Sequence, residues 1–369
     1  MASDQRAGTH RLQRAGTHDF SVQANQLLDH GTDSVRRGPC DVRGFWHSAF
    51  MDTNDADTRG TSTASHGSGT PIAAGTPAET GTPDRYAAFR DLHRPGDPLL
   101  LPNAWDHASA AALARAGFPA IGTTSLGVAA AAGKADAAGT ARAETLLLAR
   151  GIARLPALVT VDIEGGFGER PEDVAGLVRE LAAAGVVGVN LEDGRPDGTL
   201  SAVGPQCDLI RAVKDAVPEL FLNARTDTFW LKAGGEKETH ERAAAYRAAG
   251  ADGVFVPGVQ DESVIGGLTE ALDVPLNILY APGGLSPRRL AELGVRRVSS
   301  GSLLFRAAVR QAVDVAREFT RGTVGTEGLP TYAEAQALAT DFADHEGTVD
   351  GDGDGDRDRD RDADGRADD

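Results

Sequence analysis

Eight short runs rich in β-branched and aliphatic residues alternate with alanine- and leucine-rich stretches along the middle of this chain. The runs occupy residues 98–104, 120–125, 158–164, 188–193, 221–226, 253–258, 276–281 and 297–301. Helices expected between them, such as 107–116, 171–184, 238–249 and 287–293, are each followed by a glycine, as a helix C-terminus often is. This alternation predicts repeated βα units and a parallel sheet.

The number of units decides between two architectures. Eight βα units favour a closed TIM (β/α)8 barrel over an open doubly wound sheet, which usually has fewer strands and a glycine-rich phosphate fingerprint. No such fingerprint follows the first run. We therefore predict an α/β fold with one barrel domain at residues 83–345, which ends with helices at 302–320 and 332–344.

Both ends of the chain differ from the barrel in composition. Residues 1–82 are rich in Gly, Ser, Thr, Asp, His and Arg and have few periodic apolar positions, so burial cannot offset the entropy of ordering them. Residues 346–369 include an acidic run that mimics the start of an EF-hand loop but has Arg361 at its twelfth position. We predict a disordered leader and a disordered, solvated acidic tail.

Charge and cysteine content exclude several classes of protein. The 369 residues carry a net charge of -17 with a pI of about 4.9, which argues against binding to nucleic acid or to an anionic membrane surface. No run approaches the roughly 20 apolar residues that span a membrane. The two cysteines, Cys40 and Cys207, support neither a disulfide framework nor a thiolate metal site. A cytoplasmic location fits best.

Active sites of TIM barrels lie where the strands end, so the residues there can be compared without coordinates. These positions are unusually polar, with acids on two neighbouring strands and an arginine on the next. They are Asn103, Trp105, Asp106, Thr123, Thr124, Ser125, Asp162, Glu164, Glu192, Asp193, Asn223, Arg225, Asp227, Asn277, Ser299 and Ser300.

The stretch VTVDIEGGFG, at residues 159–168, indicates a metal site at this edge. Asp162 and Glu164 are two apart on the predicted strand, so both side chains point to the same face and could converge on one hard cation. With Glu192 on the next strand, several oxygen ligands suit Mg²⁺. The alternative is that these acids are solvated turn residues.

Three other features suggest chemistry, each with a structural alternative. Arg225 offers a bidentate fork to a substrate carboxylate, or else forms a structural ion pair with Glu192 or Asp227. The turn Thr124-Ser125-Leu126-Gly127 can present backbone N–H groups to an oxyanion, or is an ordinary βα loop. Cys207 lies near an expected helix start, which favours packing over nucleophilic catalysis.

Five motifs in order resemble the isocitrate lyase and phosphoenolpyruvate mutase superfamily over residues 86–320. They are TTSLGVAAAAGKAD, VDIEGGFG, NLEDG, NARTD and SSGSLLFRA. The resemblance implies a TIM barrel that forms or stabilises the enolate of a 2-oxo acid, and that breaks or makes a carbon–carbon or phosphorus–carbon bond. It also implies a dimer or tetramer.

The resemblance assigns roles to individual residues. It implies that Asp162, Glu164 and Glu192 hold Mg²⁺ partly through water, with Mn²⁺ as the alternative ion, and that Asp136 supports the metal site. Backbone amides near Ser125 and Leu126 match the pocket for the substrate's oxo or enolate oxygen, and Arg225 matches the carboxylate-binding arginine.

Two departures from the family pattern leave the reaction open. Isocitrate lyases carry a Lys-Lys/Arg-Cys-Gly-His loop after the fourth strand, but residues 194–206 read GRPDGTLSAVGPQ. Phosphonate-forming mutases carry a histidine after the sixth strand, where this chain has Pro257 and Gly258, and a lysine in the gating loop that is missing here. The acid or base could therefore be Asp197, Ser201, Arg195 or water.

We predict a Mg²⁺-dependent lyase that cleaves a carbon–carbon bond in a small 2-oxo or 2-hydroxy carboxylate through an enolate. One alternative is a mutase like phosphoenolpyruvate mutase or carboxyphosphonoenolpyruvate phosphonomutase. Another is a catalytically silent barrel that binds a metabolite, because the lid residues of both known chemistries are absent. The expected partners are a small carboxylate substrate and further copies of the chain, as a homodimer or homotetramer.

Overall fold

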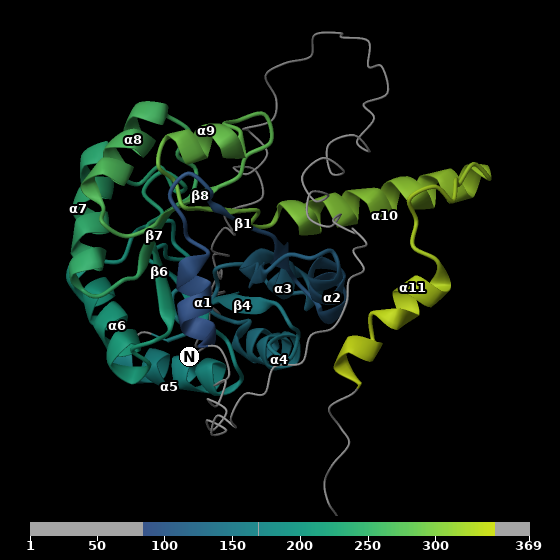
Figure 1. Cartoon of the computed structure of the whole chain (residues 1–369), viewed down its shortest axis with the longest axis horizontal. Helices are drawn as coiled ribbons and strands as arrows, with labels where there is room; N and C mark the ends of the chain where they lie inside the picture. Colours follow the sequence, from purple (N-terminus) through teal and green to yellow (C-terminus); the bar gives the residue numbers. More distant parts are fainter. Residues whose placement is uncertain (1–83, 169, 344–369) are drawn as a thin grey trace, which may run out of the picture. The chain divides into compact units, whose positions relative to one another are not determined.

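A ring of parallel strands forms the centre of the molecule, with helices around it (Figure 1). The computed structural model describes residues 84–343 except residue 169. The strands pair in the order β1-β9-β8-β7-β6-β5-β4-β3-β2. They are β1 (Leu99–Leu101), β2 (Asn103–Ala104), β3 (Ala120–Thr123), β4 (Leu158–Asp162), β5 (Gly188–Glu192), β6 (Phe221–Arg225), β7 (Gly253–Val256), β8 (Leu276–Leu279) and β9 (Arg297–Ser299).

The first predicted strand is divided in two at Pro102, which has no N–H to donate to a ladder. Its first part, β1, pairs with β9, and its second part, β2, pairs with β3. The two parts therefore join the ends of the sheet into a barrel. The predicted eight-stranded TIM barrel is confirmed, with nine strands because of this interruption.

The other seven strands end one or two residues before their predicted ends. The polar residues at these ends leave the ladder and enter loops or helices; Ser125, for example, begins α3. Glu164 follows β4 in the left-handed region, with a φ of 49°. The prediction that Asp162 and Glu164 share one face of a strand was therefore wrong, because only Asp162 belongs to β4.

Helices follow the strands as predicted, apart from the last one. The predicted helix 332–344 is shorter, since α11 ends at Ala337 and a 3-10 helix, η2, forms Thr340–Phe342. The helices are α1 (Arg85–Asp91), α2 (His107–Arg115), α3 (Ser125–Ala131), α4 (Arg142–Ile152), α5 (Pro171–Ala183), α6 (Val203–Ala216), α7 (Glu236–Ala248), α8 (Glu262–Ala271), α9 (Pro287–Glu292), α10 (Leu303–Arg321) and α11. The predicted leader 1–82 and tail 346–369 lie outside the described residues.

Apolar helix faces pack on the outside of the barrel. In α5, Val174, Leu177, Val178 and Leu181 are fully buried, and they recur at the three- and four-residue spacing of one helix face. Burial of each such side chain contributes about 1.5–3 kcal/mol. The N-terminal ends of the strands are closed by a separate apolar cluster that includes Phe89 of α1.

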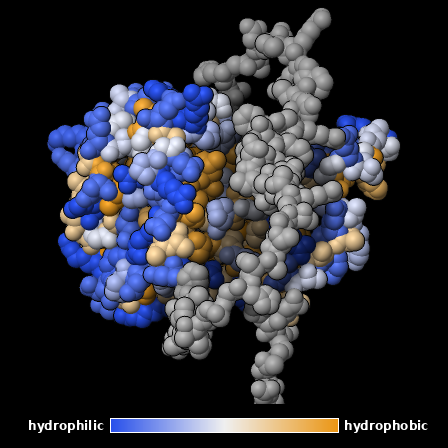
Figure 2. Space-filling view, viewed as in Figure 1, coloured by the Kyte–Doolittle hydropathy of each residue, from blue (hydrophilic) through white to orange (hydrophobic). Residues whose placement is uncertain are grey.

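Helix α10 differs from the helices of the ring. It extends away from the barrel (Figure 1) and has no buried residue. Its start packs on the barrel, where the Phe305 ring meets the Trp105 ring edge-on at 5.6 Å. Elsewhere, hydrophilic residues cover much of the surface of the outer helices (Figure 2). Within the described residues, no helix combines the length and apolar character needed to cross a membrane.

Candidate active site

Charged side chains gather where β4, β5 and β6 end. Asp162, Glu192 and Arg225 are the last residues of these strands, and Glu192 and Arg225 are register partners. Glu164 follows two residues after β4 ends. The three acids are at most 9% exposed. The structure thus brings the predicted acids and the predicted arginine to one edge of the barrel.

Arg225 contacts two carboxylates. Its Nη1 lies 2.6 Å from Glu192 Oε2, while Nε and Nη2 donate to the two Asp227 oxygens at 2.7 and 3.1 Å. The structural ion pair considered from sequence is therefore present, with both acids. A guanidinium has five N–H donors, and these contacts use three. The other two leave Arg225 able to bind a further carboxylate.

Glu164 is held by one oxygen only. Its Oε2 accepts a hydrogen bond from the Gly139 N–H at 2.9 Å, and its buried Oε1 has no partner among the described residues. Burial, with a smaller contribution from the nearby charges of Asp162 and Asp136, raises the pKa of Glu164 to about 7, although the Gly139 hydrogen bond lowers it. This carboxyl group is therefore poised to accept a cation.

Asp162 and Glu192 are also costly to ionise. Burial raises the pKa of both carboxyl groups, and the positive charge of Arg225 opposes that effect. Asp162 accepts hydrogen bonds from the Glu164 N–H, at 3.3 Å, and from the Ser125 side chain. Mutual repulsion of buried carboxylates is relieved when a cation binds among them.

The donor set fits a hard cation that keeps part of its water shell. No three His, Cys, Asp or Glu side chains between residues 84 and 343, residue 169 aside, lie close enough to surround a metal ion directly. Mg²⁺ commonly binds proteins through one or two carboxylates and several waters. The unpartnered Glu164 Oε1 is the observation that favours such an ion at this position.

The turn predicted to bind an oxyanion is the start of α3. Thr124 is the residue before the helix, and its side chain makes no capping hydrogen bond. The first N–H groups of a helix have no acceptor within it, so α3 itself supplies none for those of Ser125 and Leu126. The Ser125 contact with Asp162 places this turn beside the acids.

The two remaining predicted site residues lie on loops. Asp136, exposed between α3 and α4, raises the pKa of Asp162, Glu164 and Glu192 through its charge. Asp197 lies at the exposed tip of a loop closed by a bridge between Gly194 and Leu200. Hydrogen bonds from Thr199, at 3.0 Å from its N–H and 2.6 Å from its hydroxyl, lower the pKa of Asp197. Only Asp136 therefore joins the acids.

A polar group inside the barrel was not predicted from the sequence. Arg297 of β9 is 1% exposed; its Nε donates to Ser299 Oγ and its Nη2 to Asn190 Oδ1, both at 3.2 Å. Burial lowers the pKa of Arg297 to about 9, and the charge of Asp162 opposes this. The alternation of β9 was the available signal, because Arg297 and Ser299 share a face.

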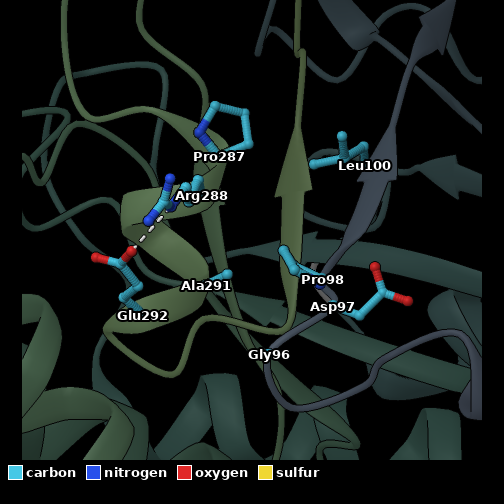
Figure 3. Close-up of a pocket in the computed structure, with 8 residues that line it drawn as sticks. All are labelled: Gly96, Asp97, Pro98, Leu100, Pro287, Arg288, Ala291 and Glu292. Carbon is cyan, nitrogen blue, oxygen red and sulfur yellow. Dashed lines mark hydrogen bonds and ion pairs between the residues drawn. The ribbon is translucent and has the colours of Figure 1, made fainter. Parts of the chain in front are cut away.

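Two further features lie away from the acids. Cys207 is buried in α6 with its Sγ 3.6 Å from the Ala245 carbonyl oxygen, and burial raises its pKa, which fits a packing role. A surface groove of about 450 Å³ lies between α9 and the start of β1 (Figure 3). It adjoins the start of β1 rather than a strand's C-terminal end, so it is separate from the candidate site.

Comparison with known proteins places the chain among enzymes of one superfamily. Residues 89–320 match the family described as phosphoenolpyruvate phosphomutase. An uncharacterized protein of Mycobacterium tuberculosis is 40% identical over 263 residues, which cover 71% of this chain and 100% of that protein. Oxaloacetate decarboxylase of Pseudomonas aeruginosa is 34% identical over 187 residues, covering 48% of this chain and 63% of that enzyme.

Solved structures share the fold. Phosphoenolpyruvate phosphomutase of Streptomyces platensis subsp. rosaceus has a TM-score of 0.62 and 25% identity, covering 69% of this chain and 95% of that chain. A phosphonopyruvate hydrolase in complex with oxalate and Mg²⁺ has a TM-score of 0.62 and 24% identity, covering 70% and 95% of the two chains.

Proposed function

The chain belongs to the phosphoenolpyruvate phosphomutase family, and from this premise we propose that it is a Mg²⁺-dependent lyase of that superfamily. It would cleave a carbon–carbon bond in a small 2-oxo or 2-hydroxy carboxylate through an enolate. The observation that carries the proposal is the meeting of buried acids with Arg225 at the ends of β4, β5 and β6. Oxaloacetate is the first substrate to test, because one relative is an oxaloacetate decarboxylase.

Asp162, Glu164 and Glu192 would hold Mg²⁺, or Mn²⁺ in its place, partly through water, and Asp136 would support them. The unpartnered Glu164 Oε1 and the raised pKa values of these buried acids support this assignment. When bound, the ion would supply positive charge beside the oxygen on which negative charge develops.

Arg225 would bind the substrate carboxylate through the two N–H donors that its ion pairs leave unused. The Ser125 and Leu126 N–H groups, after Thr124, would donate to the oxo or enolate oxygen. Such preorganised donors usually make the largest contribution to catalysis. The lowered pKa of Asp197 favours a base over an acid if its loop contacts the substrate.

An assay of 2-oxo and 2-hydroxy acids with Mg²⁺, coupled to release of pyruvate, glyoxylate or oxalate, tests the proposal. Asp162→Asn is expected to lower kcat/KM by about 100-fold or more, since a metal ligand and a buried charge are lost. Asp173→Asn is the matched control, because Asp173 is an acid on α5 that pairs with the surface residue Arg170. Similar losses in both variants would refute the assigned site.

Two alternatives to a lyase can be distinguished by further measurements. Interconversion of phosphoenolpyruvate and phosphonopyruvate, followed by ³¹P NMR without release of pyruvate or glyoxylate, would establish a mutase instead of a lyase. A silent barrel would bind oxalate or pyruvate with Mg²⁺ and lose that binding in Asp162→Asn, yet consume none of the screened acids.

We also propose that the protein is a cytoplasmic homodimer or homotetramer. Helix α10 supports self-association, because Val309, Val313 and Phe319 on it are 49%, 42% and 77% exposed. Covering such apolar side chains favours assembly. Light scattering would show the mass of a dimer or tetramer, and Val313→Asp is expected to shift it towards the monomer.

A further inference from the structure

A buried series of charged residues connects helix α7 with Arg225. Arg242 of α7 is 6% exposed and lies 3.2 Å, through Nη1, from Asp193 Oδ2. Asp193, 1% exposed, accepts through Oδ1 the backbone N–H of Asp227 at 2.8 Å. Asp227 in turn makes the bidentate pair with Arg225. The series thus joins a helix on the outside of the barrel to the candidate carboxylate-binding arginine.

Tyr246 completes the environment of Asp193. Its hydroxyl donates to Asp193 Oδ2 at 2.7 Å and accepts from Arg242 Nη1 at 3.1 Å. Arg242 and Tyr246 are four residues apart on α7, so both side chains lie on the same face of the helix. Asp193 therefore has three hydrogen-bond donors on its carboxylate, two from α7 and one from the backbone after β6.

The same residues hold both ends of the loop at 194–200. Ser201 donates its N–H to the Asp193 carbonyl oxygen at 2.7 Å, and its own carbonyl oxygen accepts from Arg242 Nη1 at 2.8 Å. Gly194, the first residue of the loop, has no room for a side chain because a Cβ there would meet the Asp227 carboxylate. The loop base is thus packed directly on the acid that orients Arg225.

We propose that Arg242 and Tyr246 are positioning residues that act through Asp193. They fix the base of the loop at 194–200 and the orientation of Asp227, and Asp227 orients the Arg225 guanidinium. The loop beside the active site and the arginine that binds the substrate would then respond together to changes on α7. The ligand role of Arg225 rests on the proposed function; the connection among these residues does not.

The contacts among these residues matter energetically because the charged groups are buried. Removing one partner of a buried charge pair leaves the other charge without compensation, which costs more than the loss of an exposed pair. A hydrogen bond to a charged group contributes enough to change an equilibrium by about tenfold. Loss of the Tyr246 hydroxyl should therefore loosen Asp193 measurably without removing any ring packing.

Tyr246→Phe is the deciding variant, and it needs two measurements. Hydrogen exchange at the Asp227 and Ser201 amides, which both donate to Asp193, should become about tenfold faster. Calorimetry with oxalate and Mg²⁺ should show about tenfold weaker oxalate binding. Arg242→Met should change both quantities further, and Tyr246→Phe remains decisive if that variant does not fold.

Arg247→Gln is the matched control, because Arg247 follows Tyr246 on α7 but pairs with Asp273 at the surface. In Arg247→Gln, hydrogen exchange at the Asp227 and Ser201 amides and the affinity for oxalate should equal those of the wild type. Unchanged exchange at both amides in Tyr246→Phe, or equal changes in Arg247→Gln, would overturn the positioning role. If the wild type binds no oxalate with Mg²⁺, the proposed function fails, while amide exchange still decides whether Tyr246 positions Asp227.

Discussion

The two ends of the barrel are buried by opposite means. At the N-terminal end, the Phe89 and Phe221 rings meet edge-on at 5.4 Å, and His93 stacks on Phe221 at 4.4 Å. At the C-terminal end, Glu164 and Glu192 are also buried, but their side chains are acids. One end is filled by rings that pack well, and the other holds acids that burial makes costly to ionise.

This difference separates stability from function within one sheet. Aromatic packing stabilises the fold whatever else binds, whereas buried acids cost free energy until a cation or substrate compensates them. The titratable groups of the two ends also respond to pH in opposite directions. The comparison therefore predicts which end each perturbation will affect.

Replacement of Phe221 should have the largest effect on stability. Phe221→Ala removes a ring that packs against Phe89 and His93, so the free energy of unfolding should fall by about 4 kcal/mol. Urea denaturation measures this change. Asp162→Asn is the matched variant at the other end, and its free energy of unfolding should stay within about 1 kcal/mol of the wild type or rise. A larger loss of stability in Asp162→Asn than in Phe221→Ala would contradict this difference between the two ends.

His93 should make the N-terminal end sensitive to acid. Burial, followed by the charge of Arg297, lowers the pKa of His93 from its usual 6.5 to about 3. Between these values the unfolded chain binds more protons, so stability falls as pH falls. At pH 4.5 His93 should cost about 3 kcal/mol relative to pH 7. The free energy of unfolding, measured by urea denaturation at each pH, should fall less steeply towards low pH in His93→Gln than in the wild type. The same pH dependence in both proteins would show that His93 does not cause the loss of stability.

Glu164 should give the C-terminal end the opposite dependence, with a smaller effect. Its pKa rises from 4.5 to about 7, so the folded state binds more protons between these values. In metal-free buffer its contribution to stability is lost as pH rises through that range, by about 2 kcal/mol. Glu164→Gln should abolish this loss, as measured by thermal melts at pH 5 and pH 8. If the stability of both proteins changed equally between pH 5 and pH 8, Glu164 would not be the cause of the pH dependence.

Local patterns were sufficient to predict most of the fold. The eight runs and the glycines after the helices predicted the barrel, because strand and helix periodicity and helix termination depend on neighbouring residues. The helix predicted at 332–344 was too long, since α11 ends at Ala337. Strand ends were also predicted too far along, because the polar residues there make contacts outside the ladder.

Sequence alone determined the identity of the candidate site residues and the end of the barrel where they would lie. Tertiary structure decided their partners: Arg225 contacts Glu192 and Asp227 together, and one Glu164 oxygen has no partner within residues 84–343. It also revealed Arg297 inside the barrel and Arg242 beneath the loop. These features depend on residues far apart in the chain, whose distance and desolvation no local pattern encodes.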